Sequence, residues 1–343
     1  MITLQDRIDV PAQRLSELRA LLHRHYLPQA LSRGMTLVDE GVSPPLMSLR
    51  APVSVWLRWT LPDLGAWWAM RAGAGEPGVA AFWAEVDAIA TQRERIVLSG
   101  DETLPEPEDV RSLACTPVGW RETAQLYLPD DPDASTHGLL AALLGEAQSE
   151  LQGLVATSLE PNLATDHGGG HYTWDLLYRD RDVARQARAG RWWREELLPG
   201  LDRHCRARSA LGLHTLGAGA RDPQLTGGVK RTALFRLLPG IDTGLRERFE
   251  RDLLDMPAFI SAIRNWRLSR AEVLDWDMDT VSPWTYVWEQ EFADLDGLTG
   301  PYMVHPHHWA HVDRWFDPES GIQVVDTALC HAFSPLPEAI ITR

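Results

Sequence analysis

The densest group of side chains able to exchange protons lies in the run from Tyr302 to Asp313, which reads YMVHPHHWAHVD. Four of the twelve histidines fall within seven residues of this run. A histidine with a near-neutral pKa can remove a proton from carbon or oxygen, and a tyrosine hydroxyl can donate a hydrogen bond to the oxyanion that forms. The segment is therefore a candidate acid–base site.

Two other interpretations of the same run remain open. Pro306 suits the first turn of a helix, which puts His307 and His311 one turn apart and His308 three residues before His311. In the simplest alternative, His305 and Pro306 cap this helix and the other histidines are solvated. A metal site made of His307, His308 and His311 is less favoured, because three histidines on one turn rarely converge and no carboxylate or cysteine nearby completes a familiar ligand set. We therefore predict no metal.

A second candidate is the run DHGGGHY, which contains His167 and His171. Its three glycines allow the backbone to approach a ligand closely or to turn sharply. His171 opens a predicted strand, on which Asp175 lies on the same face. No Lys-Ser or Lys-Thr follows, so the run is not a phosphate loop. The alternative is a flexible loop before a strand.

The elements that position these residues recur three times along the chain. Trp56, Trp174 and Trp288 each lie in a strand-like run that ends in a short acidic turn and leads to a helix. An opening strand, an amphipathic helix and a second strand precede each Trp strand, and a closing strand follows it. We predict that the three tryptophans occupy equivalent positions. The predicted closing strands are 95–98, 210–216 and 322–329.

The order β-α-β-β-α-β, repeated three times, is the ferredoxin-like arrangement and predicts an α+β fold. The three predicted units are 1–100, 118–217 and 228–335, with linkers at 100–119 and 217–228. Each unit has one sheet face without helices, which must be buried against a second sheet, so the units are expected to pair into barrels. Three units leave one without an internal partner, which predicts a homodimer.

The final third of the chain resembles the stress-responsive A/B barrel (Dabb) family. The resemblance rests on Tyr302, on His305-Pro306 followed by His308, and on the run Val324-Val325-Asp326, and it covers 228–335. It implies that Tyr302 and His308 form a cofactor-free acid–base pair in the barrel cavity. Where the family's plant polyketide cyclases have a histidine on the opening strand, this chain has Arg231.

Arg231 cannot act as a base, but it can bind a carboxylate or phenolate through two N–H groups. The first predicted unit is similar to NIPSNAP-type relatives of the same barrel superfamily, on the Trp56 strand, Phe82-Trp83 and the run 93–95.

Composition limits the classes of partner. The formal net charge is −15, which disfavours nucleic acid and acidic membrane surfaces. Three widely spaced cysteines predict no disulfide framework. The N-terminus lacks a signal-peptide pattern and no run is long and apolar enough to span a membrane, so we expect a cytoplasmic protein.

Together these features predict a cofactor-free lyase or cyclase acting on a small apolar, aromatic substrate by retro-aldol cleavage, dehydration or ring closure. His308 is the expected base, Tyr302 the acid or oxyanion donor, and Arg231 the anion anchor. Further substrate-binding residues are predicted to be His305, His307, Trp288, Tyr286, His167 and His171. The alternatives are a cofactor-free monooxygenase of the same superfamily and a non-catalytic or haem-binding barrel protein.

Overall fold

The chain divides into two compact units. The computed structural model describes residues 1–47, 50–100, 103–278 and 283–343. The first unit, called here the N-terminal unit, comprises Met1–Glu106 together with Val304–Thr327. The second, called the barrel unit, comprises Pro107–Met303 and Ala328–Arg343. The N-terminal unit is thus built from two stretches of chain with most of the barrel unit's sequence between them.

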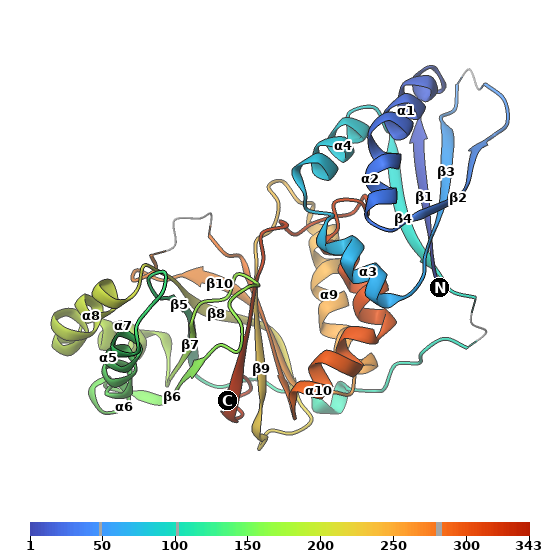
Figure 1. Ribbon diagram of the computed structural model, residues 1–343. Coiled ribbons are helices and arrows are strands. Elements are labelled where there is room, and N and C mark those ends of the chain that lie inside the picture. Colours follow the sequence, from blue (N-terminus) through green and yellow to red (C-terminus); the bar gives the residue numbers. More distant parts are fainter. Residues whose placement is uncertain (48–49, 101–102, 279–282) are drawn as a thin grey trace. The chain divides into compact units, whose positions relative to one another are not determined.

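The N-terminal unit is a ferredoxin-like fold with one antiparallel sheet. Its strands are β1 (Ile2–Val10), β2 (Thr36–Ser43), β3 (Val53–Leu61) and β4 (Gln92–Leu98), in the order β2-β3-β1-β4. Its helices are α1 (Leu15–Leu21), α2 (Leu27–Ser32), α3 (Leu64–Ala72) and α4 (Pro77–Asp87), and a π-helical turn at Leu22–Tyr26 joins α1 to α2 (Figure 1).

Alternation along the strands determines which sheet face the helices cover. On β1 the side chains of Leu4, Asp6 and Ile8 are buried, whereas Gln5 and Arg7 between them are partly exposed. The same period of two places Trp59 in the core and Trp56 on the opposite face. One face of the sheet therefore packs against helices, as predicted for an isolated unit.

The segment Val304–Thr327 completes this unit. It contains a π-helical turn at His307–Val312, followed by a 3-10 turn at Asp313–Phe316. Trp315 is fully buried. The N–H groups of Val324 and Val325 both donate to the carbonyl of Trp315 at 3.0 Å, which folds the segment back on itself.

The barrel unit contains the second and third predicted repeats. Its strands are β5 (Trp120–Tyr127), β6 (Leu154–Pro161), β7 (Tyr172–Tyr178), β8 (Ala207–Ala220), β9 (Thr226–Phe235), β10 (Ile263–Val273), β11 (Tyr286–Phe292) and β12 (Cys330–Glu338). Its helices are α5 (Ala134–Gly145), α6 (Ala147–Glu150), α7 (Arg181–Ala189), α8 (Leu198–His204), α9 (Thr243–Phe259) and α10 (Leu295–Gly297), with π-helical turns at Trp193–Leu197 and Leu298–Tyr302. Figure 1 shows α5 to α8 grouped beside β5 to β7.

All eight strands form one sheet in the order β12-β9-β11-β10-β8-β5-β7-β6. The last strand of the second repeat, β8, pairs with the second strand of the third, β10, in antiparallel register. This pairing identifies the two repeats that form the internal barrel. The predicted α+β class with ferredoxin-like units is confirmed.

The glycine-rich run closes the barrel. Gly168 forms a parallel bridge with His331 of β12, and the N–H of Leu163 donates to the carbonyl of Phe333 at 2.7 Å. A Cβ on Gly170 would lie 2.6 Å from the carbonyl oxygen of Leu126, which is closer than real Cβ atoms approach. The glycines therefore allow the backbone to lie in the seam between the two edge strands.

Two predictions about the elements were wrong. The closing strand of the third repeat is β12 and not 322–329, because the backbone of Val324 and Val325 bonds to the turn at Trp315 in the N-terminal unit. Trp56 is not equivalent to Trp174 and Trp288. All three lie on the third strand of a repeat, but Trp174 and Trp288 are buried in the core and Trp56 lies on the face opposite it. Successive side chains on a strand point to opposite faces of the sheet, so a shift by an odd number of residues moves a side chain to the other face.

Candidate functional site

The stretch Val304–Thr327, called here the histidine segment, belongs to the N-terminal unit and packs against α3. The ring of His308 lies 5.4 Å from that of Trp68, and Trp309 meets Trp67 edge-on at 5.4 Å. His307 is nearly buried, with its ring 5.0 Å from that of His311. The π-helical turn that carries these residues is a rare conformation, found often at functional sites.

His305 caps this turn. Its ring Nδ1 accepts the N–H of His307 at 3.1 Å, and its carbonyl accepts the N–H of His308 at 2.9 Å. Burial lowers the pKa of His305, which agrees with an unprotonated Nδ1. The capping role left open by the sequence therefore exists, and it fixes where His307 and His308 begin their turn.

Tyr302 belongs to the barrel unit, where Arg231 lies over its ring. The guanidinium carbon of Arg231 is 5.5 Å from the ring centroid, and Phe292 packs edge-on against the same ring at 5.5 Å. Tyr302 is 2% exposed and ends a π-helical turn. The predicted pair of Tyr302 and His308 is thus divided between the two units, whereas Tyr302 and Arg231 are brought together.

The environment of Arg231 is unusual for a buried cation. It is 5% exposed, yet in the described part of the barrel unit it bonds to an amide and an imidazole rather than to a carboxylate. It donates to the amide Oε1 of Gln290 at 2.9 Å and reaches the ring Nε2 of His331 at 3.4 Å. Buried charges in proteins are normally paired with an opposite charge, so this guanidinium is suited to an anionic ligand.

Strand register explains how this group assembles. Gln290 of β11 and Phe333 of β12 are the two cross-strand neighbours of Arg231 on β9. Two residues further along β9, Ala233 has Trp288 and His331 as its cross-strand neighbours, so its small side chain lies between two rings. Within the described residues, the indole Nε1 of Trp288 and the amide Nε2 of Gln290 are buried without a hydrogen-bond partner. The amide that Arg231 contacts therefore keeps an unpaired donor of its own.

His331 was missed by the sequence reasoning. It is an isolated histidine just beyond the predicted closing strand 322–329, and only its register against Ala233 places it near Arg231. A histidine beside an arginine on paired strands could have been found only after β12 had been located correctly.

The remaining predicted residues have structural partners. The hydroxyl of Tyr286 donates to the carboxylate of Glu250 on α9. The Nδ1 of His171 accepts the backbone N–H of Leu128 at 3.0 Å, and the carbonyl of His167 accepts the N–H of His331 at 2.9 Å. The backbone of His167 thus joins the barrel seam, whereas the ring of His171 bonds to the backbone just after β5.

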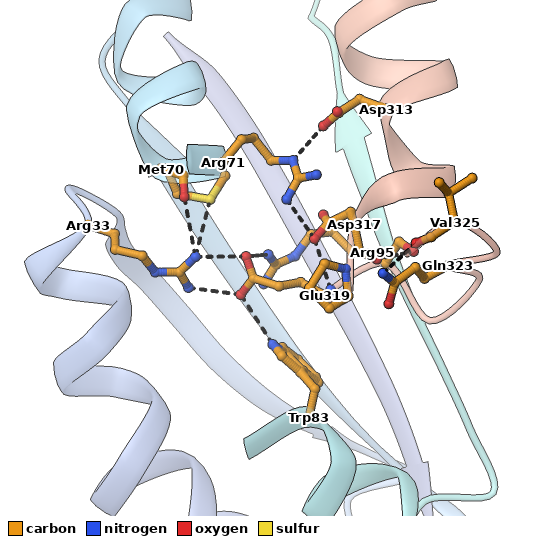
Figure 2. A network of polar contacts seen from close by, with 12 residues as sticks. Arg33, Met70, Arg71, Trp83, Arg95, Asp313, Asp317, Glu319, Gln323 and Val325 are labelled. Atoms are coloured by element: carbon orange, nitrogen blue, oxygen red, sulfur yellow. Dashed lines mark hydrogen bonds and ion pairs between the residues drawn. The ribbon is translucent and has the colours of Figure 1, made fainter. Parts of the chain in front are cut away.

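A second concentration of charge lies in the N-terminal unit. Figure 2 shows the carboxylate of Glu319 between Arg33 and Arg95, and Arg71 between Asp313 and Asp317. Arg33 donates to Glu319 at 2.9 and 3.0 Å, and Arg71 reaches Asp313 at 2.5 Å and Asp317 at 2.9 Å. These ion pairs attach the histidine segment to the first stretch of the N-terminal unit, Met1–Glu106.

The barrel interior holds a third polar group. Lys230 and Arg121 each contact both Asp175 and Glu289, so four buried charges alternate in a closed ring. The neighbouring Arg267 has its pKa lowered to about 10, because burial and the charge of Arg121 both disfavour its ionised form. The centre of this barrel is therefore ionic rather than apolar.

Other features of the surface do not coincide with these residues. A groove of about 860 Å³ is bordered by Leu154, Val183, Trp192 and Trp193, and none of the predicted site residues lines it.

Among the residues that the structure describes, no three His, Cys, Asp or Glu side chains are placed to hold a metal ion. In the same part of the chain, no helix has the length and hydropathy needed to cross a bilayer.

Comparison with known proteins shows a likeness of fold. No family model matches the chain, and no curated protein matches its sequence. An anthrone oxidase-like protein of known structure has 10% identity and a TM-score of 0.47, over 64% of this chain and 91% of that one. A NIPSNAP domain protein from Burkholderia xenovorans has 18% identity and a TM-score of 0.25, over 31% and 100%. SnoaB, a cofactor-independent oxygenase from Streptomyces nogalater, has 22% identity and a TM-score of 0.21, over 31% and 97%.

The resemblance to the Dabb family stays a prediction.

Proposed function

We propose that this protein is an enzyme that works by acid–base chemistry, without a cofactor, on a small aromatic molecule bearing an acidic hydroxyl group. The observation that supports this is the environment of Arg231, a buried guanidinium beside Tyr302 that bonds to Gln290 and His331 rather than to a carboxylate. An enolate or phenolate would supply the missing negative charge. Stabilising an anion in this way lowers the barrier to removing a proton from the substrate.

The residues take distinct roles in this proposal. Arg231 holds the substrate oxygen as it becomes negative, and the Tyr302 hydroxyl donates a hydrogen bond to it. His308, the base predicted from the sequence, belongs to the N-terminal unit. His331 is a second candidate for the base, because its ring nitrogen lies within 3.4 Å of the guanidinium.

Two different reactions begin with this removal of a proton from the substrate. In the lyase or cyclase reaction, the electron pair of the enolate breaks or forms a C–C bond within the substrate. In the monooxygenase reaction, the carbanion reduces O₂, one oxygen atom enters the substrate as a carbonyl and the other leaves as water. The names of the oxidase-like and oxygenase fold neighbours give a reason to test oxygen as a co-substrate first.

A chromogenic phenol tests the anion site directly. Titration of 4-nitrophenol with the protein below the phenol's pKa should increase the absorbance of the phenolate, because Arg231 favours the ionised form. Arg231→Met should abolish this increase. Arg7→Met is the matched control, since Arg7 also lies over an aromatic ring, Trp56, but has a carboxylate partner in Asp9. An unchanged phenol spectrum with the wild-type protein would refute the anion site.

Turnover of hydroxylated aromatic ketones, followed in air and under argon, separates the two continuations. Product formation only in air, with matching oxygen consumption, indicates the monooxygenase. Equal product formation under argon indicates the lyase or cyclase. A Soret band in the purified protein, with no turnover in either gas, would instead favour the haem-binding alternative.

A further inference from the structure

The carboxylate of Glu319 is held by an exceptional number of donors. Its side chain has no exposed surface. The Oε1 atom accepts hydrogen bonds from the Tyr26 hydroxyl at 2.5 Å, from Arg33 at 2.9 Å and from the indole of Trp83 at 3.2 Å. The Oε2 atom lies 3.0 Å from Arg33 and 2.9 Å from Arg95.

All of these donors come from the first stretch of the N-terminal unit. Tyr26 ends the π-helical turn, Arg33 follows α2, Trp83 lies on α4 and Arg95 on β4. Their aromatic rings pack on one another, with Tyr26 5.1 Å from Trp83. Glu319, by contrast, lies 286 residues after Arg33 in the sequence. The donors form a pocket, and a distant part of the chain supplies its occupant.

The charges of this pocket balance only when a carboxylate is present. Arg95 is already paired with Asp6 through two hydrogen bonds, at 2.7 and 2.9 Å. Apart from Glu319, the polar contacts of Arg33 are to the carbonyl oxygen of Met70 at 3.4 Å and to its sulfur at 3.7 Å. Removal of the Glu319 carboxylate would leave the charge of Arg33 buried without an anion, which is costly.

We propose that Met1–Glu106 form a carboxylate-binding pocket, that Glu319 is its built-in ligand, and that the pocket binds a free small carboxylate when this side chain is removed. Occupancy of the pocket also holds the histidine segment on the unit. The backbone carbonyls of Pro318 and Glu319 accept hydrogen bonds from Arg93, each at 3.0 Å, and Ser320 accepts one from the N–H of Arg95 at 3.2 Å.

Chemical rescue tests this proposal. Glu319→Ala deletes the atoms of an acetate ion and should lower the thermal unfolding midpoint of the full chain by roughly 10 °C. Sodium acetate should then raise the midpoint of the variant progressively with concentration, because a ligand that binds only the folded state stabilises it. Acetamide, the uncharged isostere, and sodium chloride at equal ionic strength should have no such effect. Acetate should not change the wild-type midpoint.

A second variant shows whether rescue occurs at this pocket. Glu319→Ala combined with Arg33→Met should lose the response to acetate. If Glu319→Ala does not fold in plain buffer, acetate must restore its near-ultraviolet circular dichroism. The proposal is overturned if acetate and acetamide act alike, if the double variant still responds, or if acetate neither stabilises nor refolds the single variant. These readouts do not depend on turnover, so they stand apart from the function proposed above.

Discussion

Lys230 donates to Asp175 at 2.5 Å from the opposite half of the barrel. Lys230 lies on β9 of the third repeat and Asp175 on β7 of the second. Glu289 and Arg121 complete the ring with the same division, one residue from each repeat. The two halves are therefore joined across their interior by charge as well as along the β8–β10 edge.

Replacing Lys230 by Met should destabilise the barrel unit strongly. Two buried carboxylates would then share Arg121 alone, and breaking a buried ion pair by removing one partner costs about 3–5 kcal/mol. Chemical denaturation measures this loss. Arg111→Met is the control, since the pair of Arg111 with Asp109 is solvent-exposed and its removal should cause no measurable change. Equal unfolding midpoints for the two variants would contradict the importance of the ring.

Asp317 should make stability depend on pH near neutrality. Burial raises its pKa to about 6 despite the attraction of Arg71. Because the folded state then binds the proton more tightly than the unfolded chain, this contribution is present below the ordinary pKa of Asp and is lost as the pH rises through about 6. Glu319 acts with the opposite sign, since its pKa is lowered by Arg95 and Arg33 in spite of burial.

The measurement is the free energy of unfolding between about pH 7 and pH 5, where Asp317 should make the protein more stable as the pH falls. Asp317→Asn removes the titrating group, so its curve should be flatter over this range. If the free energy of unfolding changes equally with pH in both proteins, Asp317 titrates outside this pH range. Below the ordinary pKa of Glu, both proteins should lose the stability that Glu319 supplies.

The acid–base roles predict that loss of His308 or Tyr302 changes kcat, whereas loss of Arg231 changes KM. Once a substrate is identified, His308→Ala should lower kcat by ~10²–10⁴-fold, as expected for loss of a general base. Tyr302→Phe should act in the same direction. Arg231→Ala should raise KM, because an anion anchor also binds the ground state. His23→Ala, at an exposed position in the π-helical turn Leu22–Tyr26, should leave both constants unchanged. Near wild-type turnover in His308→Ala would contradict the role of His308 and make His331 the candidate for the base.

The sheet face that the N-terminal unit leaves without helices predicts a homodimer. Val38, Ile96 and Leu98 have 54%, 39% and 38% of their surface exposed on this small sheet. We expect two copies to bury these faces against each other, and Ile96→Asp to shift the protein to a monomer in sedimentation experiments. Leu139→Asp is the control, because Leu139 is exposed on α5 of the barrel unit. A monomeric wild-type protein would contradict this expectation.

Local patterns predicted the repeated elements, because alternation and turn residues act over a few positions. They failed at 322–329, where two valines resemble a strand but the long-range position of the segment decides its bonding. The pairing of Arg33 with Glu319 was not predictable for the same reason. Lys230 did carry a signal: it is the only lysine in a chain rich in arginine, and it is buried.

The joining of Arg33 to Glu319 also constrains the order of events during synthesis. Domains generally begin to fold as they emerge from the ribosome, N-terminal part first. Here the first hundred residues emerge with Arg33 and Arg95 in place, but the carboxylate that neutralises them is made only after the barrel strands β5 to β11. We therefore expect the N-terminal unit to stay incomplete until nearly the whole polypeptide has been translated, and a nascent chain arrested before Glu319 to present a pocket that still lacks its anion.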